Sequence, residues 1–342
     1  MVVTTTGPTA LHAFIFGDYA SRVLPLGSSS SAIYAALVVL LLTALNVLGL
    51  RESTRTQNVV TLLLIAGMAL VAVGALQAPA PAATAAPGPP SSPLLGTALL
   101  FVLFAYGGWN EAAYISAELR GGRRAILTAL LAAIAVITVL YLVFVAALTA
   151  GLGFEGLTAS QAPAADVAQR AFGGFGKTLI AVIVCLSVLA SSNATMIVGA
   201  RSNYALALDW PIVGFMSQWD RERDAPVAAF LVQGAITLGL VGFAALEQSG
   251  VRAMVEFTAP VFWFFFMLTG VALFVLRRRY AHVARPFAVP LYPLLPLIFV
   301  GTCAYLCWRS VAYAQSQHAI QVAFGVMAVG LVLWVIARLK RD

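Results

Sequence analysis

Charged residues are scarce in this chain of 342 residues: they make up 10% of it, against about 25% in a soluble globular protein. Hydrophobic residues make up 61%, and the mean hydropathy is +0.94. A water-facing exterior cannot accommodate so much apolar surface. This composition excludes a soluble enzyme, a nucleic-acid-binding protein and a disordered tail. The sequence therefore predicts an all-α polytopic membrane protein.

Lysine, cysteine and histidine are also rare, with lysine only at Lys177 and Lys340 and three residues each of the other two. The arginines lie in short runs between apolar stretches, which is typical of membrane topology and not of a nucleic-acid-binding patch. Cys303 and Cys307 share a helical face, but no histidine or acid is near them, so buried thiols are favoured over a metal pair. The chain shows no nucleophile–base pair, phosphate-binding glycine loop or metal-ligand spacing. We expect no enzymatic activity, no cofactor and no metal.

Long apolar stretches dominate the chain, and a helix that crosses a bilayer needs about 20 mainly apolar residues. A first stretch, residues 9–26, is weaker than the others because it carries His12, Asp18 and Arg22. No basic segment and no cleavage site precede it, so it is not a signal peptide. If it crosses, the number of spans is ten. The nine clear stretches are 32–50, 59–76, 94–119, 126–148, 179–199, 227–245, 254–276, 291–313 and 320–337.

The basic residues are divided unequally between the two sets of alternate loops. One set holds fifteen of the twenty, and the other holds five. The positive-inside rule then places the richer set and the C-terminus in the cytoplasm, with the protein in the inner (plasma) membrane. The five basic residues expected outside are Arg22, Arg170, Lys177, Arg252 and Arg309.

Two outer connections stand out by their composition. Residues 77–93 hold six prolines among alanines and predict an extended, solvated loop. Residues 151–177 are long and predict a short helix over 163–172, opened by Ser160 and closed by two glycines. A connection of this length acts either as a lid or as a passive surface loop, and the sequence leaves both open.

The stretch 94–119 is interrupted near its middle by Gly107 and Gly108, which are followed by Asn110 and Glu111. Each glycine weakens a helix by roughly 1 kcal/mol relative to alanine. Unwound backbone is tolerated in a membrane only where it lines a cavity, and transporters use such breaks to bind substrates. The alternative is a neighbouring helix packed closely on the two glycines.

A stripe of small and polar residues recurs every four positions in the stretch 179–199. A stripe of this kind either lets two helices approach closely or lines an ion or substrate path. Asn193 points away from the stripe, so we expect it to bond to a different helix. The stripe consists of Ser187, Ser191, Thr195 and Gly199.

Two acidic residues are candidates for a role inside the membrane. Glu256 begins the stretch 254–276 and lies close enough to the interface for a solvated position to be favoured. The aromatic run at 262–266 is more typical of a core or lipid-facing surface than of a binding site. Asp18 is expected to pair with Arg22, one helical turn away.

These features together resemble the amino acid–polyamine–organocation superfamily of permeases, above all bacterial amino acid permeases and the L-type amino acid transporters. The resemblance runs over essentially the whole chain. Its specific parts are the run Phe-Ala-Tyr-Gly-Gly-Trp-Asn at 104–110 and Arg-Pro-Phe-Ala-Val-Pro at 285–290. Supporting features are Glu118 with Arg123 and Arg124, Ser187 to Asn193 to Arg201, Pro226 and the arginines at 277–279.

The resemblance implies twelve helices, of which the first ten form two five-helix repeats of inverted topology. On that plan the chain is one permease domain, 1–342, that lacks the first two helices. Residues 1–76 are the remainder of the first repeat, 94–279 a complete second repeat, and 291–342 two C-terminal helices with a cytoplasmic tail. About ten of the twelve helices are then present, and a truncated gene or a fragment is favoured over a functional ten-helix protein.

The resemblance also implies a binding site for an amino acid. Phe104 is the expected aromatic gate, backbone carbonyls at the break take the ammonium group, and Ser191 lines the pocket from another helix. Half of the clamp would lie on the absent first helix. The substrate-binding residues implied are Phe104, Ala105, Tyr106, Gly107, Gly108, Asn110 and Ser191.

Coupling to an ion is expected to depend on few residues. Some relatives carry a lysine in place of a sodium ion, at a position that is Leu64 in this chain. Either Ser187 and Ser191 help to hold a sodium ion, or the protein is an uncoupled exchanger. Glu111 is the one buried carboxyl group that could carry a proton, and we predict that a proton gradient does not drive transport.

The function predicted from the sequence is therefore an amino acid permease that works by alternating access in a lipid bilayer, with no nucleic acid partner. A polyamine or organic-cation permease is the rival within the same class. It requires acidic groups in the pocket, for which Glu111 is the candidate. A truncated membrane scaffold that transports nothing is the alternative from another class.

Overall fold

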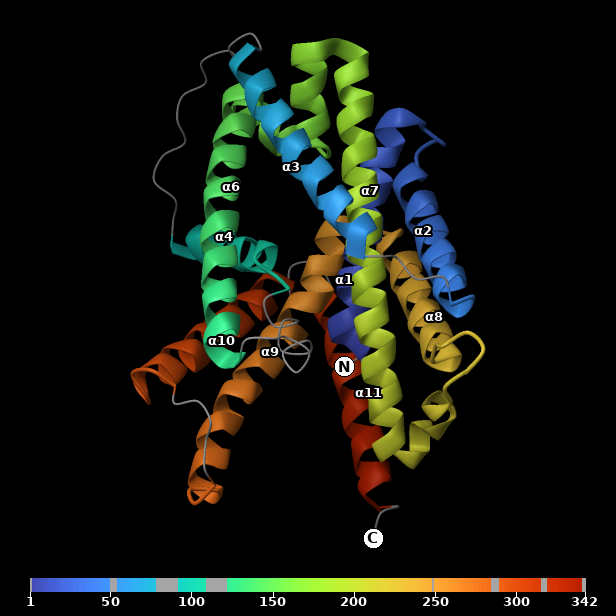
Figure 1. Ribbon diagram of the computed structural model, residues 1–342, viewed down its shortest axis with the longest axis vertical. Helices are drawn as coiled ribbons and strands as arrows, with labels where there is room; N and C mark the ends of the chain where they lie inside the picture. Colours follow the sequence, from blue (N-terminus) through green and yellow to red (C-terminus); the bar gives the residue numbers. More distant parts are fainter. Residues whose placement is uncertain are drawn as a thin grey trace. The chain divides into compact units, whose positions relative to one another are not determined.

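The computed structural model describes residues 2–49, 54–77, 92–108, 122–247, 249–283, 289–314 and 319–339. Within these ranges the regular structure is helical, apart from one isolated bridge between Asp220 and Ala225 (Figure 1). The helices are α1 (Val2–Val23), α2 (Ser30–Val47), α3 (Thr54–Gln77), α4 (Ser92–Ala105), α6 (Gly122–Ala159), α7 (Pro163–Asp209), the short 3₁₀ helix η1 (Pro211–Ser217), α8 (Val227–Ala244), α9 (Gly250–Arg279), α10 (Leu294–Ala314) and α11 (Ala319–Leu339).

Seven of these helices are long and apolar enough to cross a membrane: α2, α3, α6, α7, α8, α9 and α10. Two more, α1 and α11, have 22 and 21 residues, and α4 is shorter with 14. The chain is therefore a multi-pass helical membrane protein, as its composition predicts. The two inverted repeats stay a prediction.

The chain folds into two compact units. The first comprises Met1–Ala85, Val143–Thr258 and Phe324–Asp342, and the second comprises Ala86–Leu142 and Ala259–Ala323. Each unit takes segments that are distant in sequence. The helices α6, α9 and α11 contribute to both.

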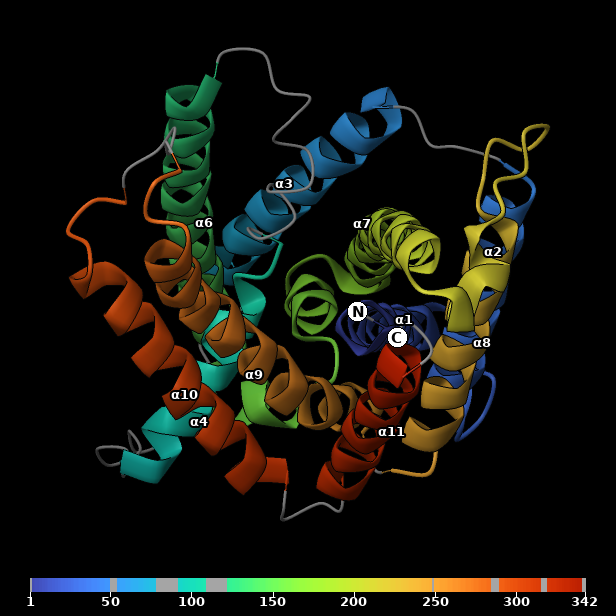
Figure 2. The same ribbon diagram turned by 90° about the horizontal axis from the view of Figure 1, so that it is seen from below.

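In the first unit, α1 packs against α7, α2 and α8 (Figure 2). Its buried face includes Ala10, Ala13 and Phe14, together with Thr6 and Thr9. Gly17 lies against the backbone of α2, where a Cβ atom would overlap the carbonyl oxygen of Ser31. The absence of a side chain at this position therefore sets how closely α1 and α2 approach.

The predicted interhelical bond of Asn193 is present. Asn46 in α2 donates a hydrogen bond of 2.6 Å to the side-chain oxygen of Asn193 in α7, and another of 2.8 Å to the carbonyl of Leu42. Both asparagines are 5% exposed. Such a bond fixes the rotation of the two helices about their axes, because a rotation would leave a buried amide without an acceptor.

Replacement of Asn193 with leucine is expected to destabilise the first unit by about 1–2 kcal/mol, the scale of interhelical hydrogen bonds in membranes. The measurement is the shift in apparent melting temperature of the purified protein in one detergent. The double variant with Asn46→Leu should lose less than the sum of the two single losses. Strict additivity would contradict a direct bond.

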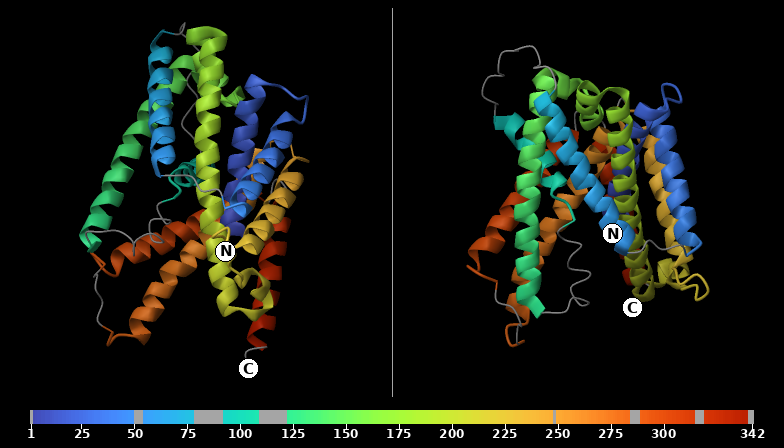
Figure 3. Two further views of the ribbon diagram at one scale, coloured as in Figure 1. Left: turned by 45° about the vertical axis from the view of Figure 1, so that its right-hand side comes forward. Right: turned by 45° about the horizontal axis from the view of Figure 1, so that its top comes forward.

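The connection 151–177 is folded and not an irregular loop. The predicted short helix is confirmed: α7 begins at Pro163, and Gly173, with φ 67° and ψ −156°, interrupts it. Gly153, with φ 71° and ψ 170°, interrupts α6 in the same way. At such angles a Cβ atom would clash with the backbone, so glycine, which has no Cβ atom, is suited to both positions. At each of these two glycines the chain changes direction, so the segment between them folds back beside the long parts of α6 and α7 (Figure 3).

Apolar side chains hold this folded connection in place. Leu152, Val167 and Ile180 are buried with Val71 of α3. Alanines at 162, 164, 165 and 168 complete the cluster. A passive surface loop would leave such residues exposed, so the structure favours a connection with a defined position.

In the second unit, α4 packs against α10. Arg309 of α10 donates a hydrogen bond of 3.0 Å to the hydroxyl of Thr97 in α4. The aromatic run of α9 is mixed in environment: Trp263 is 6% exposed, and Phe265 is 45% exposed. Phe262 and Phe266 stack with their ring centroids 4.4 Å apart. Core packing thus accounts for part of the run.

Candidate functional site

Helix α4 ends where the sequence predicts a break in the stretch 94–119, and residues 109–119 lie outside the described part of the chain. Helix α4 ends at Ala105, and a turn of Tyr106, Gly107 and Gly108 follows it. Gly108 adopts φ 92°, in the region that side-chain-bearing residues rarely enter. The helix therefore ends at the paired glycines.

Two tyrosines connect this turn to α6. The hydroxyl of Tyr106 donates to Thr138 Oγ1 over 3.0 Å, and the hydroxyl of Tyr141 donates to the carbonyl of Ala105 over 2.9 Å. The two tyrosine rings meet edge to face, with centroids 5.3 Å apart. Residues of α6 thus set the position of the end of α4.

Two of the backbone carbonyls expected to bind the ammonium group already accept hydrogen bonds. The Phe104 carbonyl accepts from the amide of Gly107 over 3.1 Å, and the Ala105 carbonyl accepts from Tyr141. Within the described residues, the carbonyls of Tyr106 and Gly107 accept none. These two carbonyls are the better candidates for a ligand.

Phe104, the expected gate, is half-buried and packs on Phe262, with the ring centroids 5.4 Å apart. The aromatic run of α9 therefore meets the end of α4 inside the second unit. Its role as a gate stays a prediction. Asn110 and Glu111 lie outside the described residues, as do Trp109 and Glu118.

The serine stripe lies on α7 in the first unit. Ser187 is half-buried and Ser191 is exposed, while the carbonyl of Ser191 accepts a 3.0 Å bond from Thr195. At the other end of the stripe, a Cβ atom on Gly199 would lie about 2.5 Å from the side-chain amide of Gln233 in α8. Close packing therefore explains the glycine, and the part of the serines in binding stays a prediction.

The expectation for Glu256 is wrong. The residue is 3% exposed and not solvated. Helix α9 begins at Gly250, before the apolar stretch does, so position 256 lies well inside the helix. Hydropathy alone did not indicate that packing against the rest of the protein buries this carboxyl group.

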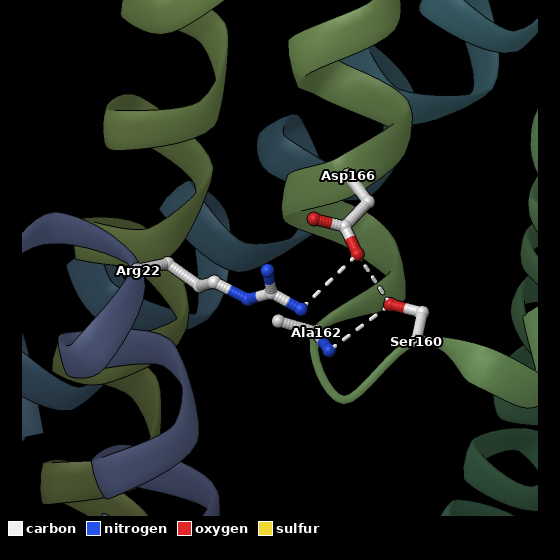
Figure 4. A network of polar contacts seen from close by, with 4 residues as sticks. All are labelled: Arg22, Ser160, Ala162 and Asp166. Atoms are coloured by element: carbon white, nitrogen blue, oxygen red, sulfur yellow. Dashed lines mark hydrogen bonds and ion pairs between the residues drawn. The ribbon is translucent and has the colours of Figure 1, made fainter. Parts of the chain in front are cut away.

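The expected pairing of Asp18 with Arg22 is also wrong. Asp18 accepts a hydrogen bond of 2.6 Å from the hydroxyl of Ser31. Arg22 instead forms an ion pair of 3.3 Å with Asp166, a residue 144 positions away (Figure 4). The two side chains point toward one another from α1 and α7.

Sequence reasoning missed two groups of polar residues in the first unit. One is the surroundings of Asp166, although an acid in the first turn of the predicted helix 163–172 was a visible signal. The other is Gln233, 0% exposed in an apolar helix, whose side-chain atoms have no hydrogen-bond partner within the described part of the chain. A glutamine inside a span was the available signal.

The three cysteines are free thiols, and Cys303 is buried. Among the described residues no group of three metal-ligating side chains occurs. Cys307 lies 3.7 Å from the carbonyl of Pro260. This geometry suits packed thiols.

A profile described as amino acid permease matches residues 5–336, nearly the whole chain. The chain belongs to the amino acid permease family. The resemblance stated from the sequence is thereby confirmed. The family is one of transporters and not of enzymes.

Relatives of this permease chain include transporters and exchangers. It is 24% identical over 326 residues to the serine/threonine exchanger SteT of Bacillus subtilis (strain 168), covering 94% of this chain and 73% of that protein. It is 24% identical over 311 residues to a methylthioribose transporter of the same organism, covering 88% and 65%. It is 24% identical over 319 residues to the b(0,+)-type amino acid transporter 1 of Mus musculus, covering 90% and 63%. The chain thus spans about two thirds of the length of these relatives.

Proposed function

We propose that this permease moves amino acids across the cytoplasmic membrane as a secondary transporter, by alternating access around the end of α4. The observation that carries the proposal is the interruption at Gly108 in a chain of the amino acid permease family. A helix terminus inside a membrane presents unpaired backbone groups that a substrate can satisfy.

The chemistry of the α4 terminus suits an ammonium group. The C-terminal end of a helix carries a partial negative charge, equivalent to about half an elementary charge, from its aligned carbonyls. The carbonyls of Tyr106 and Gly107 follow this negative end in the chain, and Phe104 belongs to the last turn of the helix. On this proposal Asn110 faces the substrate side chain and Ser191 lines the pocket.

Orientation is part of the same proposal. The excess of basic residues in one set of loops supports a cytoplasmic C-terminus. The folded connection around 151–177 then lies outside the cell. The test is the labelling of single cysteines placed at exposed positions of each set with a membrane-impermeant thiol reagent.

Uptake measurements test the function. The full-length protein in proteoliposomes should accumulate or exchange radiolabelled serine, threonine or leucine in a saturable manner. Empty vesicles and vesicles with Gly108→Val are the controls. The absence of saturable uptake and exchange of every amino acid tested would overturn the proposal and favour a scaffold that does not transport.

Two other substrates are included in the same assay. One relative is a methylthioribose transporter, so methylthioribose is tested as a competitor. Putrescine tests the polyamine alternative, for which Glu111 would supply the acidic group. If either compound competes and amino acids do not, the protein's substrate is that compound's class and not amino acids.

We predict that a proton gradient does not drive this transport. Leu64 cannot take up a proton, and the hydroxyls of Ser187 and Ser191 suit a hard cation such as sodium. The measurement is serine uptake with an imposed pH gradient, with and without sodium. Accumulation that follows the pH gradient and disappears in Glu111→Gln would contradict the prediction and make Glu111 the proton carrier.

A further inference from the structure

A cavity of about 550 Å³ lies beside the ion pair of Arg22 and Asp166, within the first unit. Its volume falls within the range of about 300–1,000 Å³ that is typical of small-molecule sites. It is lined by Arg22, Leu152, Gly156, Ala159, Ser160, Asp166, Gln169 and Arg170. This cavity, called here the hairpin cavity, is formed by the end of α1 and the folded connection between α6 and α7.

The carboxylate of Asp166 is held by only one of its oxygens. Oδ2 accepts from Arg22 over 3.3 Å and from the hydroxyl of Ser160 over 2.5 Å (Figure 4). Ser160 in turn accepts from the amide of Ala162 over 3.1 Å. Oδ1 accepts from no described residue. The carboxylate is thus fixed in place with one oxygen available to a positively charged group.

The two guanidinium groups also keep donors available. Each guanidinium carries five N–H donors. Arg22 uses Nη2 for Asp166, and Arg170 uses Nη1 for the carbonyl of Gly151 over 3.0 Å. In the described part of the chain, their other nitrogens donate no further bond. A planar guanidinium binds a carboxylate through two parallel hydrogen bonds.

We propose that the hairpin cavity binds a free α-amino acid as a zwitterion. The substrate carboxylate lies on the guanidiniums of Arg22 and Arg170, and the ammonium group lies on Oδ1 of Asp166. Two cations and one anion line the cavity, so a zwitterion meets a partner for each of its charges. The choice of an amino acid as ligand rests on the proposed function. The residues that line the site all belong to the first unit.

Partial burial strengthens the charges of Arg22 and Asp166, while Arg170 is exposed. The side chains of Arg22 and Asp166 are 34% and 22% exposed, so water screens them less than it would on an open surface. Leu152 and Ala159 supply apolar wall, and Gln169 is exposed at the edge.

The test is protection of a cysteine placed in the cavity wall. Purified Gln169→Cys protein in detergent is treated with a charged methanethiosulfonate reagent, and the parent protein corrects for the three native cysteines. Serine raised to about ten times its Kd should slow the labelling of position 169 about tenfold, because the unoccupied fraction falls as 1/(1 + [L]/Kd). Propionate and ethanolamine, which each carry one of the two charges, should protect far less.

Variants of the charged residues complete the experiment. Arg170→Gln and Asp166→Asn, each combined with Gln169→Cys, should abolish protection by serine. Arg252→Gln is the matched control, because Arg252 is an exposed arginine of the same unit that does not line the cavity, and protection should persist. The melting temperature of each variant, measured in parallel, shows whether the fold is retained.

The outcomes separate this proposal from the proposed function. Serine uptake in proteoliposomes with no protection at position 169 would overturn the hairpin cavity as a binding site and leave a structural ion pair. Protection without any uptake would support the cavity and overturn the transport proposal. Equal protection by propionate and serine would overturn the zwitterion assignment, since Asp166 would then contribute nothing.

Discussion

Replacing Gly108 with valine is expected to abolish amino acid uptake while the protein still inserts into the membrane. Gly108 has φ 92°, and a residue with a Cβ atom pays about 1–2 kcal/mol there, with a larger penalty for a β-branched side chain. The turn would relax toward negative φ and reorient the carbonyls of Tyr106 and Gly107. A cost of about 1–2 kcal/mol corresponds to a loss of about five- to thirtyfold in initial uptake rate, and the β-branched side chain of valine adds to this loss.

The measurement is initial serine uptake in proteoliposomes, normalised to the amount of protein reconstituted. Gly239→Val is the matched control, because a Cβ atom at this helical glycine of α8 meets no atom within 4 Å. Gly107→Ala should lose less than Gly108→Val, because Gly107 has no positive φ and its nearest obstacle is the Phe104 carbonyl at 3.2 Å. Uptake by Gly108→Val at the parent rate would show that the break serves packing alone.

Replacing Gly17 with valine is expected to cause the largest loss of stability. A Cβ atom there would overlap the backbone carbonyl of Ser31, which cannot rotate away as a side chain would. Overpacking against movable side chains costs about 1–3 kcal/mol, and a backbone obstacle places this variant at or above that upper value. The hydrogen bond from Ser31 to Asp18 would be lost with the contact.

The measurement is the fraction of monodisperse protein after size-exclusion chromatography, together with the apparent melting temperature. Gly242→Val provides the control, since a side chain at this position of α8 also meets open space. Gly17→Val protein with the parent's melting temperature would mean that α1 and α2 are not packed as closely as the structure places them.

The spans were predictable because a bilayer imposes length and apolarity on every helix that crosses it. Their ends were less so. Helix α1 begins at Val2 and not near residue 9, with Thr6 and Thr9 fully buried. The hydroxyl of Thr9 bonds back to the carbonyl of Thr5 over 2.8 Å, so threonines are accepted where hydropathy alone predicts an end.

Periodicity gave directions but not partners. It indicated that Asn193 faces another helix. That its partner is Asn46 follows only from how the helices pack in the tertiary structure. The local rule that pairs Asp18 with Arg22 failed because Ser31 and Asp166 provide closer partners from other helices. Contacts between residues this far apart in sequence depend on the packing of whole helices.

The paired glycines predicted the break in α4 but not which glycine carries the unusual backbone angle. Only the structure assigns the positive φ to Gly108. It also shows the Tyr141 hydroxyl on the Ala105 carbonyl, a contact that no local pattern predicts. The site residues beyond position 108 stay predictions.

The bonds from Tyr106 to Thr138 and from Tyr141 to Ala105 have a mechanical consequence for any transport cycle. They connect the end of α4 to the middle of α6 at two points, so the two segments are expected to move together as a rigid body. Conformational change during transport is then expected in the parts of α6 that are not bonded to α4.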